Sequence, residues 1–266
     1  MLYQVADVWP DRDLEYIVRV LMPHHENPDA MVRTLRADPE ILDGMLSDNR
    51  LFNQLMNETD QVLNVSGRLF FSVLLNRARL DLKEHPFTFE RDNRYGVVVF
   101  DAALVLGFLG DRAVRSYLAT VLASFVRIES KTVYVRRGTS TFRKVRVNDF
   151  DIESLIEFSG LVDDEQQVYL FKRIGEICLF LIGVFSDYIE TQQQLPGAWY
   201  RSKSKKELAE CGSYYFRAAS RHRAHLPAEL EHALSRMSEE FLLATKPLNY
   251  ISKKYLGYLE HTVFLQ

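Results

Sequence analysis

Residues 163–190 read DDEQQVYLFKRIGEICLFLIGVFSDYIE, and the pattern of this stretch predicts the centre of the fold. Apolar side chains recur in it at intervals of three and four residues, which is the period of one helix face. They are Leu170, Ile174, Ile177, Cys178, Leu181, Val184, Phe185 and Tyr188. Other sides of the same helix carry Phe171, Leu179, Phe180 and Ile182. A helix that is apolar on nearly all sides must be covered on nearly all sides, so we expect it to be buried among other helices.

The limits of this central helix also follow from the sequence. Asp163, with Gln166 three residues later, is typical of an N-cap and its capping partner. Pro196-Gly197 marks the other end, because proline lacks the N–H that a helix needs. The apolar part is too short to cross a bilayer and contains Glu176. We therefore expect a core helix and no association with a membrane.

The composition favours helices over strands. Among 266 residues there are only 12 glycines and 8 prolines, and many-stranded folds use more of both at their turns. The sequence predicts a mainly α fold, a helical bundle or array around the central buried helix with one projecting β-hairpin. We expect a single compact helical domain over residues 1–266, and the pattern also allows two lobes, 1–130 and 149–266, joined by the hairpin 132–147.

Two features predict a cytoplasmic location. The chain has two cysteines, Cys178 and Cys211, which do not form the disulfide framework of a small secreted protein. We expect both thiols to serve core packing. Residues 1–7 lack a basic region followed by an apolar run, so no signal peptide is expected.

Two basic stretches are candidate binding surfaces. Residues 132–147 alternate in twos around Gly138-Thr139-Ser140, which predicts a β-hairpin. Its candidate residues for an anionic partner are Tyr134, Arg136, Arg137, Arg143, Lys144 and Arg146. The second stretch offers Lys203, Lys205 and Lys206, and continues past Tyr214 and Tyr215 to Arg217, Arg221 and Arg223. Clustered cations suit phosphate groups or an acidic protein surface, although basic residues also keep ordinary surface elements soluble.

The order of elements before the hairpin adds a nucleic-acid hypothesis. A helix near 65–82, a possible strand at 97–100, two helices separated at 107–110 and the hairpin form a winged-helix-like segment over residues 65–147. The second of the two helices offers Arg112, Arg115 and Ser116 in its first turns, where contacts to a nucleic-acid groove would lie. The competing interpretation is a solvated hairpin that braces the core.

Catalytic and metal-binding patterns are weak in this sequence. It has no glycine-rich phosphate loop, no nucleophile elbow and no His-Glu-x-x-His run. His222, His225, Glu229 and His232 would share a face on one unbroken helix, but Pro227 interrupts it. The acids Asp101 and Glu176 lie in apolar runs, where each is expected to pair with an arginine, to turn outward, or to be an active-site acid. We predict no cofactor and no metal.

These patterns favour a non-catalytic helical interaction or scaffold protein that binds another macromolecule. The alternative is a nucleic-acid-binding protein that uses the winged-helix-like segment and its basic hairpin. A second alternative is a hydrolase or metal enzyme without a recognisable motif. The position of Arg136, Arg143, Lys144, Lys205 and Lys206 decides between the first two, because a polyanion site requires these side chains on one face.

Overall fold

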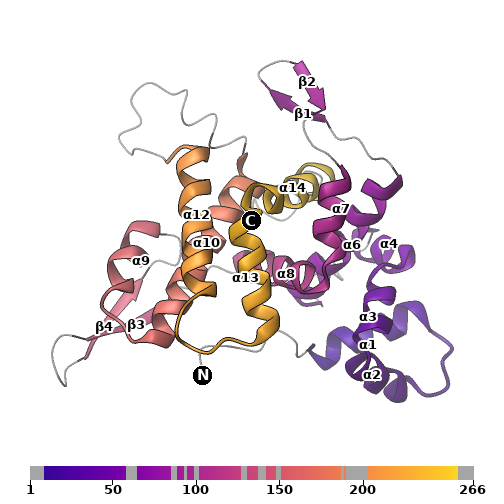
Figure 1. The fold of residues 1–266 in the computed structure, drawn as a ribbon. Coiled ribbons are helices and arrows are strands. Elements are labelled where there is room, and N and C mark those ends of the chain that lie inside the picture. The colour runs from indigo at the N-terminus through magenta and orange to yellow at the C-terminus, as the bar shows by residue number, and fades with distance from the viewer. Residues whose placement is uncertain are drawn as a thin grey trace. The chain divides into compact units, whose positions relative to one another are not determined.

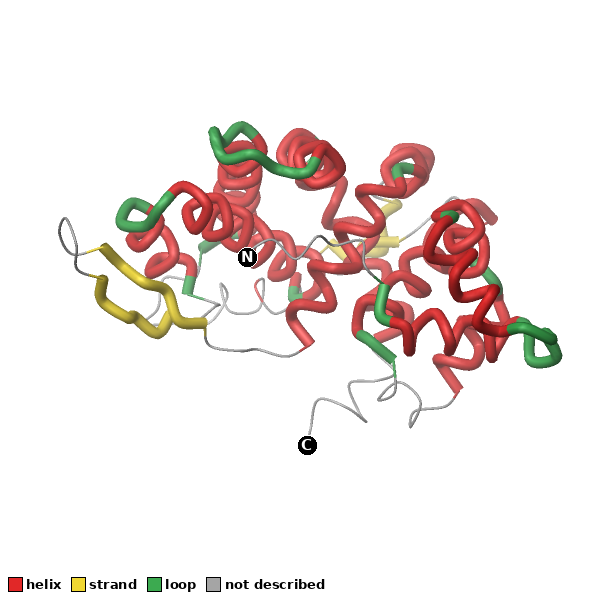
Figure 2. Tube along the Cα trace, turned by 90° about the horizontal axis from the view of Figure 1, so that it is seen from below, coloured by secondary structure: helices red, strands yellow, loops and turns green. Residues whose placement is uncertain are grey.

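The computed structural model describes residues 9–57, 65–84, 89–92, 95–98, 102–126, 131–136, 142–147, 151–186, 189 and 203–256. Within these ranges the protein is mainly helical, as predicted (Figure 1). Strands in the described part occur only as two short antiparallel pairs (Figure 2). The chain divides into two compact units, Val5–Val126 and Arg127–Gln266. That residues 1–266 act as one domain stays a prediction.

In its described residues, the unit Val5–Val126 consists of helices and one strand pair. Its elements are α1 (Asp11–Leu21), α2 (Pro28–Ala37), α3 (Pro39–Leu46), α4 (Asn49–Asn57), α6 (Gly67–Glu84), β1 (Phe89–Asp92), β2 (Tyr95–Val98), α7 (Ala102–Gly110) and α8 (Arg112–Val126). Helix α6 packs against α3, α4, α7 and α8, and it buries apolar side chains along most of its length. It is therefore the core helix of this unit.

A buried carboxylate joins α1 to the start of α6. Asp13 is 0% exposed and accepts hydrogen bonds from Ser66 N at 2.9 Å and Ser66 Oγ at 2.5 Å. The Ser66 hydroxyl oxygen accepts in turn from Leu69 N at 3.1 Å, as an N-cap residue does. The buried Asp13 carboxylate therefore has hydrogen-bond donors in Ser66, which offset the cost of removing it from water.

The unit Arg127–Gln266 contains the helix that the sequence places at the centre. Its elements are β3 (Lys131–Arg136), β4 (Phe142–Val147), α9 (Ile152–Ser159), α10 (Asp164–Val184), α12 (Lys205–Ser220), α13 (Ala228–Glu239), α14 (Phe241–Ile251) and the π-helical turn η1 (Ser252–Leu256). Helix α10 packs against α9, α12 and α14 (Figure 1). Eleven of its residues are buried, so the helix is covered within its own unit.

The predicted N-cap of α10 is confirmed. Asp163 Oδ1 accepts from Gln166 N at 2.9 Å, and Asp163 Oδ2 accepts from Gln166 Nε2 at 3.1 Å. Helix α10 is described as far as Val184, and the predicted end at 196–197 lies outside the described residues. Helix α12 opens with a capping box formed by Ser204 and Glu207.

Glycine permits the close approach of α12 to α10 and α14. A methyl group added to Gly212 would overlap the Phe241 ring and lie 2.9 Å from Cys178 Cβ. A methyl group on Gly175 would lie 2.7 Å from Phe216 Cδ1. The helix axes therefore lie closer together here than side chains larger than hydrogen allow.

The C-terminal helices differ from the sequence prediction. The pattern predicts one helix from Pro227 through Leu242 and a final helix over 248–259. Instead α13 ends at Glu239, and α14 runs from Phe241 to Ile251 with Pro247 inside it. A proline costs a helix one backbone hydrogen bond, so the sequence favours a helix start near it. Here Pro247 is buried among the apolar residues of α14, and the helix continues through it.

The predicted hairpin region consists of two paired strands. β3 and β4 are antiparallel, with Val133 opposite Val145 and Tyr134 opposite Lys144. The tip at 137–141 and the strand side chains lie outside what the structure describes, so the projection of this hairpin from the helices stays a prediction. None of the helices in the described ranges is long and apolar enough to cross a bilayer.

Candidate anion-binding surface

A broad, open depression lies where α12 ends. Its volume is about 460 Å³, and it is lined by Tyr214, Arg217, Ala218, Arg221, His222 and Arg223. We call these six residues the Tyr214–Arg223 surface. Three of the six are arginines, so the surface is suited to negatively charged groups.

One stripe of α12 carries the exposed part of this surface. Tyr214 and Arg217 lie three residues apart on α12, and Arg221, the C-cap residue, follows four residues later on the same side of the helix end. Both arginines are exposed, and among the described residues neither guanidinium group has a hydrogen bond or an ion pair. Two like charges four residues apart repel each other, while the helix C-terminus attracts both. The stripe therefore presents uncompensated positive charge to solvent.

The third arginine is already paired. Arg223 Nη2 lies 2.5 Å from Asp164 Oδ1, at the start of α10. The hydrogen bond to Asp164 raises the pKa of Arg223, and the same bond lowers the pKa of the Asp164 carboxyl group. This pair ties the turn after α12 to α10. The net charge of the surface then comes from Arg217 and Arg221.

His222 lines one side of the surface and is held through both ring nitrogens. Its Nδ1 accepts a hydrogen bond from Ala224 N at 3.1 Å. Its Nε2 is hydrogen-bonded to Gln167 Oε1 at 2.8 Å. Gln167 in turn donates through Nε2 to Ser159 O at 2.7 Å, which fixes the orientation of its amide.

A row of packed aromatic rings lies beneath the Tyr214–Arg223 surface, on its buried side. Tyr214 is 65% exposed, and its ring meets that of Tyr215 edge-on at a centroid distance of 5.1 Å. Tyr215 contacts Phe171 at 5.5 Å, and Phe171 contacts His222 edge-on at 6.1 Å. Burial raises the pKa of Tyr215, as expected for a phenol covered by neighbouring rings. The exposed Tyr214 ring is thus held against a row of packed aromatic side chains.

The lysines predicted as binding residues lie at the other end of α12. Lys203 Nζ is 3.3 Å from Glu153 Oε1, and Lys206 Nζ is 4.0 Å from Glu210 Oε1. Lys205 also takes part in interactions. A rise of about 1.5 Å per residue puts these three lysines about 17–27 Å from Arg217 and Arg221 along the helix direction. The structure therefore does not bring these three lysines into the depression.

The hairpin residues remain untested as a binding surface. Tyr134 and Arg136 belong to β3, and Arg143, Lys144 and Arg146 belong to β4. Arg137 and the side chains of the other five lie outside the described residues, so their convergence with α12 stays a prediction. The spacing of Tyr214, Arg217 and Arg221 is the sequence signal that finds the depression.

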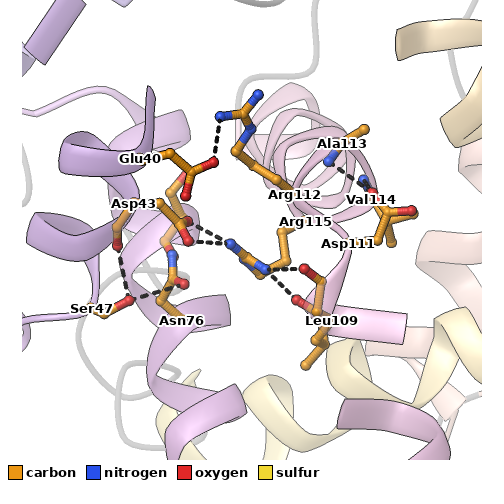
Figure 3. Close-up of polar contacts among 12 residues, drawn as sticks. Glu40, Asp43, Ser47, Asn76, Leu109, Asp111, Arg112, Ala113, Val114 and Arg115 are labelled. Atoms are coloured by element: carbon orange, nitrogen blue, oxygen red, sulfur yellow. Dashed lines mark hydrogen bonds and ion pairs between the residues drawn. The ribbon is translucent and has the colours of Figure 1, made fainter. Parts of the chain in front are cut away.

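Arg115 is not a groove-contacting residue, which corrects the sequence interpretation. It is 4% exposed, and its Nη2 contacts Asp43 Oδ1 at 2.5 Å and Oδ2 at 2.6 Å (Figure 3). Its Nη1 donates to the carbonyl oxygens of Leu109 and Gly110 at the end of α7. The guanidinium group therefore links α3, α7 and α8 inside the unit Val5–Val126.

The other two residues proposed for a groove are also engaged. Arg112 Nη1 lies 3.4 Å from Glu40 Oε1, and Ser116 Oγ accepts from Arg68 Nη2 at 3.2 Å. The winged-helix-like segment 65–147 also crosses the boundary between the two units at residues 126 and 127. Burial therefore excludes Arg115 as a groove contact, whereas nucleic-acid binding by the segment 65–147 stays a prediction.

The two thiols form a pair across α10 and α12. Cys178 is buried and Cys211 is half-buried, and a hydrogen bond joins their sulfur atoms. This bond, followed by burial, raises the pKa of Cys178. The same bond lowers the pKa of Cys211, because the Cys178 thiol donates to the Cys211 thiolate. The sequence predicts only core packing for Cys211, but its lowered pKa makes it more acidic than an ordinary cysteine.

The remaining candidate residues for chemistry have structural surroundings. Buried Glu176 lies 2.6 Å from Lys172 Nζ and 3.3 Å from Arg173 Nη1, so of the three alternatives the structure shows pairing, with a lysine as well as an arginine. Helix α13 begins after Pro227, so Glu229 and His232 lie on it while His222 and His225 precede it. Within the described ranges no three His, Cys, Asp or Glu side chains gather as a metal site. Asp101 lies outside the described residues.

Comparisons of the chain with protein-family models, with curated proteins and with solved structures find no match. The function is therefore argued from the residues of the chain.

Proposed function

We propose that the protein is a non-catalytic interaction protein whose unit Arg127–Gln266 binds a polyanionic macromolecule at the Tyr214–Arg223 surface. The observation that carries this proposal is the pair Arg217 and Arg221. Both are exposed, Arg217 on α12 and Arg221 at its C-cap, and neither has an anionic partner in the described part of the chain. Guanidinium groups pair well with phosphates and carboxylates, so these two arginines are available to bind the anionic groups of a ligand.

The form of the depression favours a large ligand over a small one. A site for a small molecule encloses most of its ligand. The Tyr214–Arg223 surface is open and its polar groups come from one helix and the following turn. A macromolecule that lies across the helix end covers such a surface without being enclosed by it.

The distribution of charge also favours anion binding by the unit Arg127–Gln266. Residues 127–266 contain 20 Lys and Arg against 18 Asp and Glu, whereas residues 5–126 contain 13 against 18. Long-range attraction of a polyanion therefore favours the unit that carries α12.

Inorganic polyphosphate is a suitable probe, because it carries charge without bases or peptide groups. We expect the full chain to bind it at low salt. The double variant Arg217→Gln/Arg221→Gln should weaken binding at least tenfold, because two charge-assisted contacts are lost.

The matched control is Lys203→Gln/Lys206→Gln, which removes the same charge from the other end of α12. It should change the dissociation constant by less than about threefold, as expected for rim charges. An equal loss in both double variants, or no binding by the unaltered chain at low salt, would contradict the proposed surface.

A further inference from the structure

We infer that the polyanion is a single-stranded nucleic acid, with Arg217 and Arg221 on its phosphates and Tyr214 stacked on a base. This inference rests on the proposed function and adds the class of partner. It is carried by the exposed aromatic ring beside two arginines that have no partner among the described residues.

The two guanidinium groups are spaced for a chain of phosphates. Arg217 and Arg221 are separated by about 6 Å along the helix axis. Their side chains are long and flexible, so two neighbouring phosphates of one strand are within reach of both. Phosphate contacts of this kind give affinity that does not depend on sequence.

Tyr214 offers an exposed aromatic ring, which binds bases and is not needed for binding phosphate. Its ring is 65% exposed and is braced edge-on by Tyr215, which in turn contacts Phe171. A base that stacks on such a ring gains about a 5- to 100-fold increase in affinity, with little dependence on base identity. Bases in a duplex are already stacked on each other and are not free to do so.

The remaining residues of the surface limit where the nucleic-acid strand can lie. Asp164 holds Arg223 at 2.5 Å, and its carboxylate places negative charge on the α10 side. Both ring nitrogens of His222 are occupied, by Ala224 N and by Gln167 Oε1. A phosphate backbone is therefore favoured along the stripe of Tyr214, Arg217 and Arg221, away from the start of α10.

The test compares four probes by fluorescence anisotropy on the full chain: a twelve-nucleotide oligo-dT strand, a duplex of equal length, inorganic polyphosphate and poly-glutamate. We expect the single strand to bind most tightly. Tyr214→Ala should weaken binding of the strand about 5- to 100-fold and leave polyphosphate binding within about twofold. Tyr214→Phe is the matched control and should retain binding, because it keeps the ring.

The outcomes separate the inference from the proposed function. If Tyr214→Ala leaves strand binding unchanged while Arg217→Gln/Arg221→Gln reduces it, stacking is wrong and the anion-binding surface stands. Tighter binding of poly-glutamate or of the duplex than of the single strand overturns the inference in favour of an acidic protein or double-stranded DNA. No binding of any of the four probes at low salt overturns both proposals.

Discussion

Cys211 shows how one contact changes the chemistry of a residue. Its pKa is lowered by the hydrogen bond from Cys178 and then raised in part by burial, and Lys203 lowers it further. The pKa of Cys178 is raised by the same bond and by its burial. Since the thiolate is the reactive form of cysteine, the two thiols should differ in reactivity at neutral pH.

We expect iodoacetamide to alkylate Cys211 of the folded protein and to leave Cys178 unmodified, as read by peptide mass spectrometry. The rate should reach half its maximum at a lower pH than the rate of an exposed cysteine in a model peptide, because the pKa of Cys211 is lowered. Cys178→Ala removes the donor, so the midpoint should rise and the rate at pH 7 should fall. Cys178→Ser keeps an O–H donor and should preserve the low midpoint. Equal modification of both thiols in the folded chain would contradict the assigned roles.

Helices α3 and α8 are joined by two ion pairs that differ in burial. Asp43 lies against Arg115, whose side chain is 5% exposed, whereas Glu40 and Arg112 are 86% and 42% exposed. Asp43→Ala leaves the Arg115 charge buried without its carboxylate, so we expect about 3 kcal/mol of destabilisation. Glu40→Ala breaks the exposed pair and should cost less than about 1 kcal/mol. Urea unfolding of the full chain measures both, and similar values for the two variants would show that Arg115 is not held as described.

The sequence predicts those elements whose causes are local. The N-cap at Asp163 follows from Gln166 three residues later, and the structure confirms it. The capping box of Ser204 and Glu207 has the same local spacing. The break between α13 and α14 is not predictable in this way, because Pro247 is accommodated by its buried surroundings. The ion pair of Asp43 and Arg115 joins positions 72 residues apart, so it depends on packing that no local pattern encodes.

At the scale of the whole molecule, charge is divided between the two units. The sequence already shows an acidic first part, and it also contains the residues of the Tyr214–Arg223 surface. It does not show which basic residues are neutralised. Glu153 pairs with Lys203 and Asp164 pairs with Arg223, and only the fold brings these partners together. Anion binding by the predicted lysines stays a prediction, and our proposal rests on Arg217 and Arg221 instead.

A bound single-stranded nucleic acid should make few phosphate contacts, all of them in the unit Arg127–Gln266. Two phosphate contacts on a single strand predict a slope of about −1.4 in log K against log salt, and each Arg→Gln change should reduce its magnitude by about 0.7. Hydrogen exchange of the full chain with oligo-dT should show protection around residues 214–223. The Arg217→Gln/Arg221→Gln variant should lose that protection. Protection centred instead on α8, or on the strands β3 and β4, would place the polyanion elsewhere and contradict the assignment to α12, because a strand held by the hairpin needs neither Arg217 nor Arg221.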